Sequence, residues 1–294
     1  MHVWWARPKD ARPELRALLD PVERARYEST VDPVGKERFL VGCALSRLVL
    51  GERLGLPPAD VPLRRVCPRC GGPHGKVRLG AAVPPDGPVR TPPAYDFSVT
   101  HSGALVGVAL CRGGEVGLDV EDSHGVLDVD SAARVALSGP ELAALYARPA
   151  AERQRAFLRT WTRKEAVLKA LGVGLAAPLR ELEVSDPDRP PTVLTWPSRL
   201  TPHPSMRLAD LTVDGKHPAA VAVACERAVV EAEAVAGEGA VVEAAEAVAG
   251  EGAVAEAAEA GSADGDGDGP WARRPGAVRV TVHDGSSTLA AYDR

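Results

Sequence analysis

Hydrophobic residues recur at helical spacing in two stretches of the chain and alternate at strand spacing in several others. Residues 35–55 place apolar side chains on one face of a helix, which a glycine and two following prolines bring to an end. Residues 152–171 predict a second amphipathic helix. Between the two helices, residues 95–121 favour a three-stranded antiparallel meander with turns near 101–104 and 112–115.

Three later segments, RELEVSD, MRLADLTV and AAVAVACE, favour strands of a second sheet. A helix and a sheet therefore occur twice, which predicts an α+β body of two similar lobes, residues 1–118 and 119–225. Residues 271–294 contain an alternating segment with an Asp-Gly pair, which predicts a C-terminal hairpin.

Residues 226–270 differ from the rest of the chain in composition. They form a degenerate Ala/Glu/Gly repeat without the aromatic and branched side chains that a core needs, so we expect a disordered acidic insert. This segment holds twelve acidic residues and one basic residue, which leaves 34 basic and 28 acidic residues in the remainder. The body thus carries a formal charge of +6, although the whole chain carries −5.

Composition narrows the function classes. A chain of 294 residues that is 45% hydrophobic can form a sizeable core, and no run approaches the ~18 apolar residues that span a bilayer. The start of the chain does not resemble a secretory signal, and five scattered cysteines do not resemble a disulfide framework, so we expect a cytoplasmic protein. The basic excess is too diffuse for nucleic acid and suits an anionic small molecule or an acidic protein.

Three carboxylates stand at positions where a role beyond solvation can be argued. Asp119 and Glu121 alternate along a predicted strand and share one face, roughly 6 to 7 Å apart. They lie either on a solvated edge or beside a positive charge. Glu165 continues the apolar stripe that includes Trp161, so it either forms a surface ion pair with Lys169 or faces the acidic strand. In the second case the three carboxylates would make an oxygen site of the kind that Mg²⁺ prefers.

The blocks FSVTHSG, VGLDVE and WTRKEAVLKALGVGL resemble, in this order and spacing, the signatures of the Sfp-type 4'-phosphopantetheinyl transferases. The resemblance extends from about Val3 to Cys225. It implies two pseudo-symmetric lobes with coenzyme A at their junction. It also implies a Mg²⁺-dependent enzyme, a holo-[acyl-carrier-protein] synthase, acting as a monomer without nucleic acid or membrane. Such an enzyme moves the 4'-phosphopantetheine arm of coenzyme A to a serine of an apo acyl or peptidyl carrier protein and releases adenosine 3',5'-bisphosphate.

The resemblance also assigns roles to residues. It implies Asp119, Glu121 and Glu165 as metal ligands, Glu165 also as the base for the carrier serine, and Lys169 as the cation for the pyrophosphate. It further implies coenzyme-binding roles for Arg26, Lys76, Thr100, His101 and Lys164. Without the resemblance, His101 reads equally well as a turn histidine and Arg26 as an exposed helix residue. Val77 stands where the family usually has proline, so the loop of Lys76 is expected to differ.

The sequence gives weaker support for two other kinds of site, a zinc knuckle and a serine hydrolase. Cys67, Cys70 and His74 have the close spacing of a zinc knuckle, but no fourth ligand is evident. A serine hydrolase using Ser98 or Ser102 with His101 and Asp119 lacks the nucleophile-elbow motif. The remaining alternative is a non-catalytic carrier-protein or zinc-knuckle adaptor of the same fold, against which the complete acidic set argues.

Overall fold

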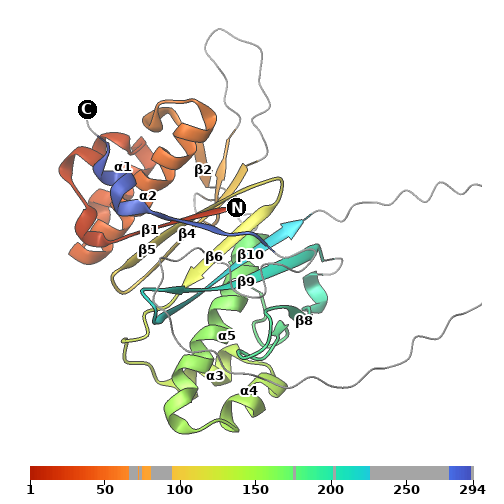
Figure 1. Ribbon diagram of the computed structural model, residues 1–294. Helices are drawn as coiled ribbons and strands as arrows, with labels where there is room; N and C mark the ends of the chain where they lie inside the picture. Colours follow the sequence, from red (N-terminus) through yellow and green to blue (C-terminus); the bar gives the residue numbers. More distant parts are fainter. Residues whose placement is uncertain are drawn as a thin grey trace, which may run out of the picture.

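The computed structural model describes residues 1–65, 72, 75–80, 95–174, 177–200, 203–225 and 278–292. Two sheets lie at its centre, with strand orders β11-β1-β5-β4 and β6-β10-β9, and a long helix packs against each (Figure 1). The combination of helices with mostly antiparallel sheets is the α+β fold that the sequence predicts.

The first sheet and its helices come mainly from the chain up to Arg112. Their bounds are β1 (His2–Ala6), α1 (Pro21–Ser29), α2 (Pro33–Leu54), β4 (Tyr95–Ser102) and β5 (Leu105–Arg112), with a small ladder of β2 (Leu63–Arg65) and β3 (Val77–Leu79). Short 3₁₀ helices occupy Pro8–Asp10, Pro13–Leu18 and Pro58–Asp60.

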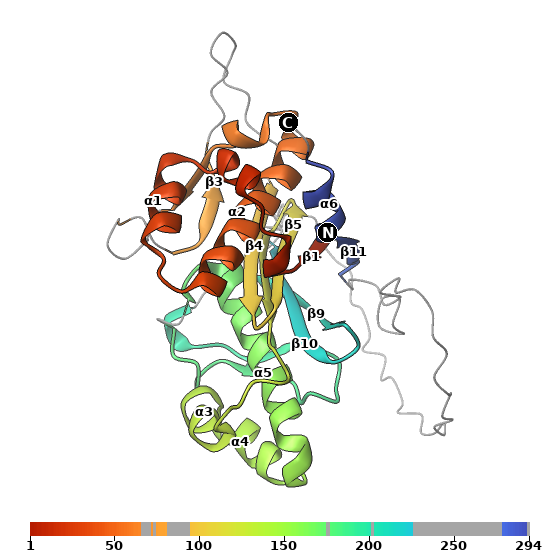
Figure 2. The ribbon, with the colours of Figure 1, turned by 90° about the vertical axis from the view of Figure 1, so that its left-hand side faces the viewer.

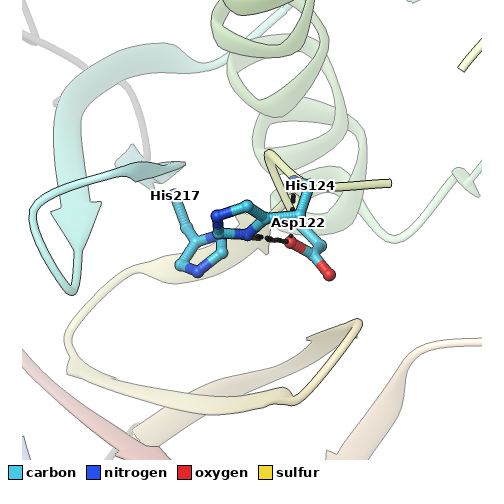
Figure 3. Close-up of side chains that lie close together, drawn as sticks. All are labelled: Asp122, His124 and His217. Carbon is cyan, nitrogen blue, oxygen red and sulfur yellow. Dashed lines mark hydrogen bonds and ion pairs between the residues drawn. The ribbon is translucent and has the colours of Figure 1, made fainter. Parts of the chain in front are cut away.

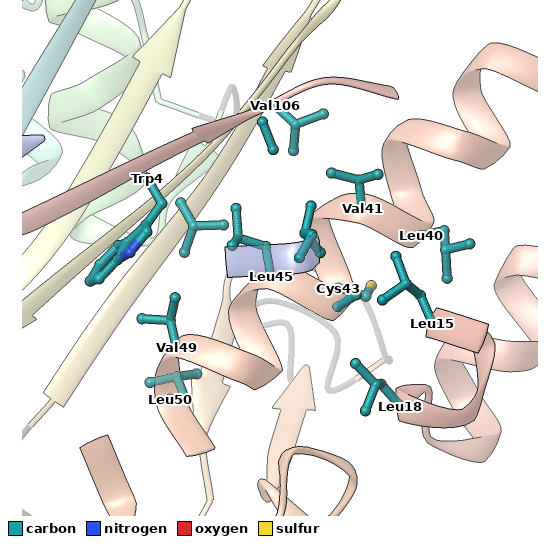
Figure 4. Packing of buried hydrophobic residues seen from close by; sticks show 14 of the residues in the cluster. Trp4, Leu15, Leu18, Leu40, Val41, Cys43, Leu45, Val49, Leu50 and Val106 are labelled. Carbon is teal, nitrogen blue, oxygen red and sulfur yellow. The ribbon is translucent and has the colours of Figure 1, made fainter. Parts of the chain in front are cut away.

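Helix α2 forms where the sequence predicts it and supplies the core of this half. The Asp32 side chain accepts a hydrogen bond from the Gly35 amide at its start, and Gly55 ends it with a left-handed φ of 67°. Its buried face packs against the sheet, where Leu45 lies near Trp4 and Val106 (Figure 4). Each fully buried side chain of this kind contributes roughly 1.5–3 kcal/mol.

The second half contains a longer run of helix. Its bounds are β6 (Glu115–Val120), α3 (Val129–Ala136), α4 (Gly139–Tyr146), α5 (Ala150–Leu171), β7 (Glu183–Val184), β8 (Val193–Thr195), β9 (Ser205–Val213) and β10 (His217–Cys225), with a 3₁₀ helix at Ser198–Leu200. The predicted helix over 152–171 is confirmed as α5, which packs against β6 and β10 of the second sheet. Helices α3 and α4 lie beside the lower end of α5 (Figure 2).

Strand β7 does not join the second sheet, so that part of the prediction is wrong. It pairs with β8 in a separate ladder. The fully buried Arg163 of α5 donates to the carbonyl oxygens of Ser185 and Asp186, which holds the chain directly after β7 against the helix.

The predicted meander is also corrected, because only its first two strands pair. Strand β5 pairs with β4 and with β1, whereas β6 pairs with β10 in the second sheet. Side chains of β4 nevertheless bridge to β6: Asp96 accepts from the Val116 amide, Ser98 from Leu118 and Ser102 from Asp122. The two sheets therefore meet along a parallel seam of side-chain hydrogen bonds, which satisfies backbone amides that no strand covers.

The C-terminal hairpin is the third correction. Residues Thr281–Asp284 form β11, which pairs parallel to β1, and Gly285–Ala290 form helix α6. The Asp-Gly pair begins this helix rather than a turn, because the Asp284 side chain accepts from the Ser286 amide as an N-cap. The acidic segment 226–270, predicted to be disordered, lies outside the described residues.

Among the helices that the structure describes, none is both long and apolar enough to cross a lipid bilayer.

Candidate functional site

Strand β6 and helix α5 approach each other unusually closely at Gly117. A Cβ atom built there would lie 1.9 Å from the carbonyl oxygen of Ala166 and 2.4 Å from the amide nitrogen of Ala170. Only glycine permits this contact. The approach places Asp119, two residues further along the strand, beside the last turns of α5.

Asp119 and Glu165 form the buried part of an acidic cluster, with 5% and 8% of their surfaces exposed. Asp119 Oδ1 accepts from Lys169 Nζ at 2.6 Å and from Thr100 Oγ1 at 3.2 Å. Lys169 also donates to the Leu118 carbonyl. The acidic face of β6 thus has Lys169 as a positive neighbour, in addition to the metal ion that the sequence predicts.

Glu121 is held by two neutral donors. Trp161 Nε1 donates to Glu121 Oε1 at 3.0 Å, and Ser102 Oγ donates to Oε2 at 2.8 Å. The same Ser102 oxygen accepts from the Asp122 amide. These bonds fix the carboxylate without neutralising it.

Two carboxylate oxygens in the cluster are left without a partner. Among the described residues, Asp119 Oδ2 and Glu165 Oε1 are buried and accept no hydrogen bond. Burial raises the pKa of Asp119 to about 6 against the opposing effect of Lys169, and burial together with the Asp119 charge raises the pKa of Glu165 to about 7. Buried, mutually repelling oxygens of this kind fit a hard divalent cation, which would supply both the missing charge and the missing contacts.

A cavity of about 610 Å³ opens beside the cluster. Glu165 and Lys169 line one part of it, and Arg26 and His101 line it as well. The Arg26 guanidinium lies 5.3 Å from the centre of the Phe39 ring. Burial, followed by the charges of Arg38 and Lys169, lowers the pKa of His101. The basic side chains suit a ligand that carries several negative charges.

Lys76 lines this cavity, but its ammonium group is already engaged. It forms an ion pair with Asp96 and donates to the carbonyl oxygens of Val116 and Ala170. An ammonium group has three donors, and these three acceptors use them all. Lys76 thus ties its loop to β4, β6 and α5 while it lines the cavity, and its predicted coenzyme contact stays a prediction.

Lys164 does not reach the cavity. Its fully buried ammonium group pairs with Glu141 Oε2 at 2.5 Å and donates to the carbonyl oxygens of Ala136 and Leu179. These three acceptors hold the Lys164 side chain inside the fold, and its predicted coenzyme-binding role stays a prediction. The roles predicted for Thr100, His101, Arg26 and Lys169 stay predictions.

Sequence reasoning missed several residues that shape the site. Trp161 and Ser102 orient Glu121, and Arg38 and Arg65 line the cavity. Ser102 could have been found from the polar residues at every second position of β4, because alternate side chains share one face. The arginines carried no such signal, since exposed arginines are common on any helix or strand.

Two other candidates from the sequence were a zinc knuckle and a serine hydrolase. Cys67, Cys70 and His74 lie outside the described residues. The hydrolase alternative is not supported, because Ser102 Oγ donates to Glu121 and Ser98 Oγ accepts from the Leu118 amide. Neither serine has the histidine contact that activates a nucleophile among the hydrogen bonds of the described residues.

Comparison with known proteins gives a consistent result. Residues 115–223 match the family model described as the 4'-phosphopantetheinyl transferase superfamily. The 4'-phosphopantetheinyl transferase HetI of Nostoc sp. is 30% identical over 227 residues, which cover 76% of this chain and 87% of HetI. The 4'-phosphopantetheinyl transferase psf-1 of Bacillus pumilus is 29% identical over 171 residues, or 57% of this chain and 65% of psf-1. The holo-[acyl-carrier-protein] synthase structure from Thermotoga maritima aligns over 38% of this chain and 64% of that chain, at 20% identity and a TM-score of 0.31.

Proposed function

Because this chain belongs to the 4'-phosphopantetheinyl transferase superfamily, we propose that it transfers the 4'-phosphopantetheine arm of coenzyme A to a serine of an apo acyl or peptidyl carrier protein. The products are the holo carrier protein and adenosine 3',5'-bisphosphate. Membership of the Sfp-type subgroup is part of the proposal and is supported by the blocks FSVTHSG, VGLDVE and WTRKEAVLKALGVGL. The cytoplasmic location and the monomeric state stay predictions from the sequence.

The observation that carries the proposal is the acidic cluster at the edge of a basic cavity. Asp119, Glu121 and Glu165 are the residues that would hold Mg²⁺, and their two unpartnered oxygens support this assignment. When bound, Mg²⁺ would stabilise the negative charge of the coenzyme A pyrophosphate and the negative charge that develops on the leaving phosphate.

Glu165 is the proposed base for the carrier serine. A general base must lie within hydrogen-bond reach of the proton that it takes. Its carboxylate lines the cavity, so a serine hydroxyl entering from solvent can reach it. The proton of the hydroxyl then passes to Glu165 as the serine oxygen attacks the phosphorus atom.

Lys169 is the proposed cation for the departing phosphate. It stands next to the acidic cluster and lines the cavity, so one side chain touches both the metal site and the coenzyme site. The cavity is also lined by Arg26, Arg38 and Arg65, which suit the other phosphates of coenzyme A.

A mass-spectrometric assay tests the proposal. An apo carrier protein incubated with the enzyme, coenzyme A and Mg²⁺ should gain the mass of one phosphopantetheine group on a single serine. Asp119→Ala should lose most of this transfer while keeping the circular dichroism spectrum of the parent, because the change removes a ligand oxygen rather than a core contact. An unmodified carrier across a panel of apo carrier proteins would instead indicate a non-catalytic adaptor.

A further inference from the structure

A second group of metal-binding side chains lies just beyond the end of β6. Asp122 follows the strand, His124 stands in the next loop and His217 begins β10 (Figure 3). One ligand atom from each residue lies within 4.8 Å of the other two. None of the three lines the cavity described above. We propose that Asp122, His124 and His217 form a second metal site, for Zn²⁺ or a similar transition-metal dication.

Two of the three distances between ligand atoms agree with a shared ion, and the third, between the two histidines, is at most 4.8 Å. Asp122 Oδ1 lies 3.2 Å from His124 Nδ1 and 3.3 Å from His217 Nδ1. Ligands bound to one Zn²⁺ at about 2.0–2.1 Å are separated by roughly 2.9 to 3.4 Å, depending on the coordination geometry. The Asp122 oxygen therefore already lies at the separation from each ring nitrogen that two ligands of one Zn²⁺ ion have.

The proton positions also leave room for a cation. The Ser123 amide donates to His217 Nδ1 at 3.1 Å, so this nitrogen is an acceptor and carries no proton. It consequently has no proton to share with Asp122 Oδ1, which lies only 3.3 Å away. A dication between them relieves this contact. Because it competes with the Ser123 amide for the nitrogen, we expect an exchangeable ion.

The surroundings prepare the three side chains unequally. The His217 side chain is 8% exposed and Asp122 is 28% exposed, with its second oxygen against the Gly103 turn. His124 is 61% exposed. Asp122 and His217 are thus held by the fold, whereas His124 would bind the ion from the solvent side. Imidazole nitrogens suit Zn²⁺, Cu²⁺ or Ni²⁺ better than Mg²⁺, which separates this site chemically from the acidic cluster.

The site is tied to the acidic cluster through the backbone. The Asp122 amide donates to Ser102 Oγ, and that hydroxyl donates to Glu121. An ion at Asp122 therefore stabilises the end of β6 where it leaves the cluster, and it joins this end to the start of β10.

Zinc titration of the full-length chain tests the site. The titration uses a variant with Cys67→Ser and Cys70→Ser, which removes the other candidate zinc ligands. Excess Mg²⁺ is added to occupy the acidic cluster. Competition with a chromophoric chelator should show one Zn²⁺ bound. His124→Ala should weaken this binding at least about tenfold, since even outer-shell changes at metal sites cost that much.

Matched variants define the contrary results. His283→Ala alters another histidine pair, between His2 and His283, and should leave zinc affinity unchanged. Because His124 is exposed, its replacement should preserve both the fold and the transfer rate, so the titration is independent of the proposed function. Three results would each overturn the site: no Zn²⁺ bound in this background, equal affinity in the His124→Ala variant, or binding that is lost with Glu165→Gln instead.

Discussion

Glu121 differs from the other two carboxylates of the cluster because both of its oxygens accept hydrogen bonds from neutral groups. Trp161 and Ser102 provide these bonds, from α5 and β4 respectively. Asp119 and Glu165 each retain an oxygen without a partner among the described residues. Glu121 is thus held in a fixed orientation by its hydrogen bonds. The unpartnered oxygens of Asp119 and Glu165 instead provide the negative charge that a bound cation would neutralise.

Trp161→Phe tests this positioning. The substitution removes the indole N–H and keeps an aromatic ring to stack on Phe157. We expect the half-saturating Mg²⁺ concentration for transfer to rise about tenfold or more, because a ligand loses its orienting bond. Saturating Mg²⁺ should restore much of the rate. Trp196→Phe is the matched control, since Trp196 stacks on His203 and donates no bond to the cluster.

The two lysines of α5 should respond in opposite ways. Lys164→Met leaves Glu141, whose side chain is only 7% exposed, without its counter-charge, and breaking such a buried pair costs about 3–5 kcal/mol. Lys169→Met removes a partly exposed cation at the cavity and should reduce transfer with a smaller effect on stability. Urea unfolding and transfer rates measured on both variants check this. A stable Lys164→Met protein with impaired coenzyme binding would support the coenzyme-binding role that the resemblance implies for Lys164.

At the scale of elements, the seam between β4, β6 and α5 builds the site. Asp96, Ser98 and Ser102 of β4 accept hydrogen bonds from backbone amides of β6 and of Asp122 just after it, and Thr100 donates to the Asp119 side chain. Gly117 then lets α5 press against the other side of the strand. The proposed catalytic groups are therefore positioned by close backbone approach, and precise placement of this kind is what phosphoryl transfer needs.

Gly117→Ala measures the importance of this approach. The added methyl group would collide with helix backbone at Ala166, which cannot move aside as a side chain can. Overpacking of this kind costs at least about 1–3 kcal/mol, and we expect transfer to fall because Asp119 is displaced from Lys169. Gly139→Ala is the control, since a Cβ there meets nothing within 4 Å. Equal stability and activity of the two variants would mean that the seam is adaptable.

The sequence predicts those elements whose signals are local. Helices α2 and α5 are predicted because the apolar periodicity lies within each segment, and Gly55 marks the end of α2. The partner of β6 could not be predicted, since pairing with β10 joins residues that are about a hundred positions apart. Strand and helix periodicity singles out the acidic residues, and the resemblance implies their metal role. The acceptors of Lys76 and Lys164 could not be predicted, because sequence does not reveal which acceptors a buried ammonium group finds.

At the scale of the whole molecule, the C-terminal residues return to the N-terminal half. Strand β11 pairs with β1, and Leu289 of α6 is buried in the core around α2. Arg12 donates to the carbonyl oxygens of Leu289 and Tyr292. Val278 and Cys225 both pack against the buried cluster that includes Val3 and Val221.

Two shortened chains should therefore behave differently. Deleting residues 229–269 keeps β11 and α6 and should leave the unfolding midpoint and the transfer rate nearly unchanged. Ending the chain at Cys225 exposes the edge of β1 and the Leu289 site, and should lower the midpoint by on the order of 5 °C. Differential scanning calorimetry on both forms gives the comparison. Equal midpoints for the truncated and the full-length chain would show that β11 and α6 contribute little to stability.

The charge of the acidic segment gives a prediction about the carrier protein. The body carries a formal +6 and residues 226–270 carry −11, so the tethered polyanion competes with an acidic carrier for the same basic surface. Deleting residues 229–269 should then lower the apparent KM for an acidic apo carrier at low salt, with kcat little changed. The difference should shrink at high salt, because screening weakens both attractions. Titrating one carrier against both enzymes at two salt concentrations measures this. Identical KM values at low salt would make the segment a passive tether, and a KM independent of salt in both enzymes would remove electrostatic steering from carrier binding.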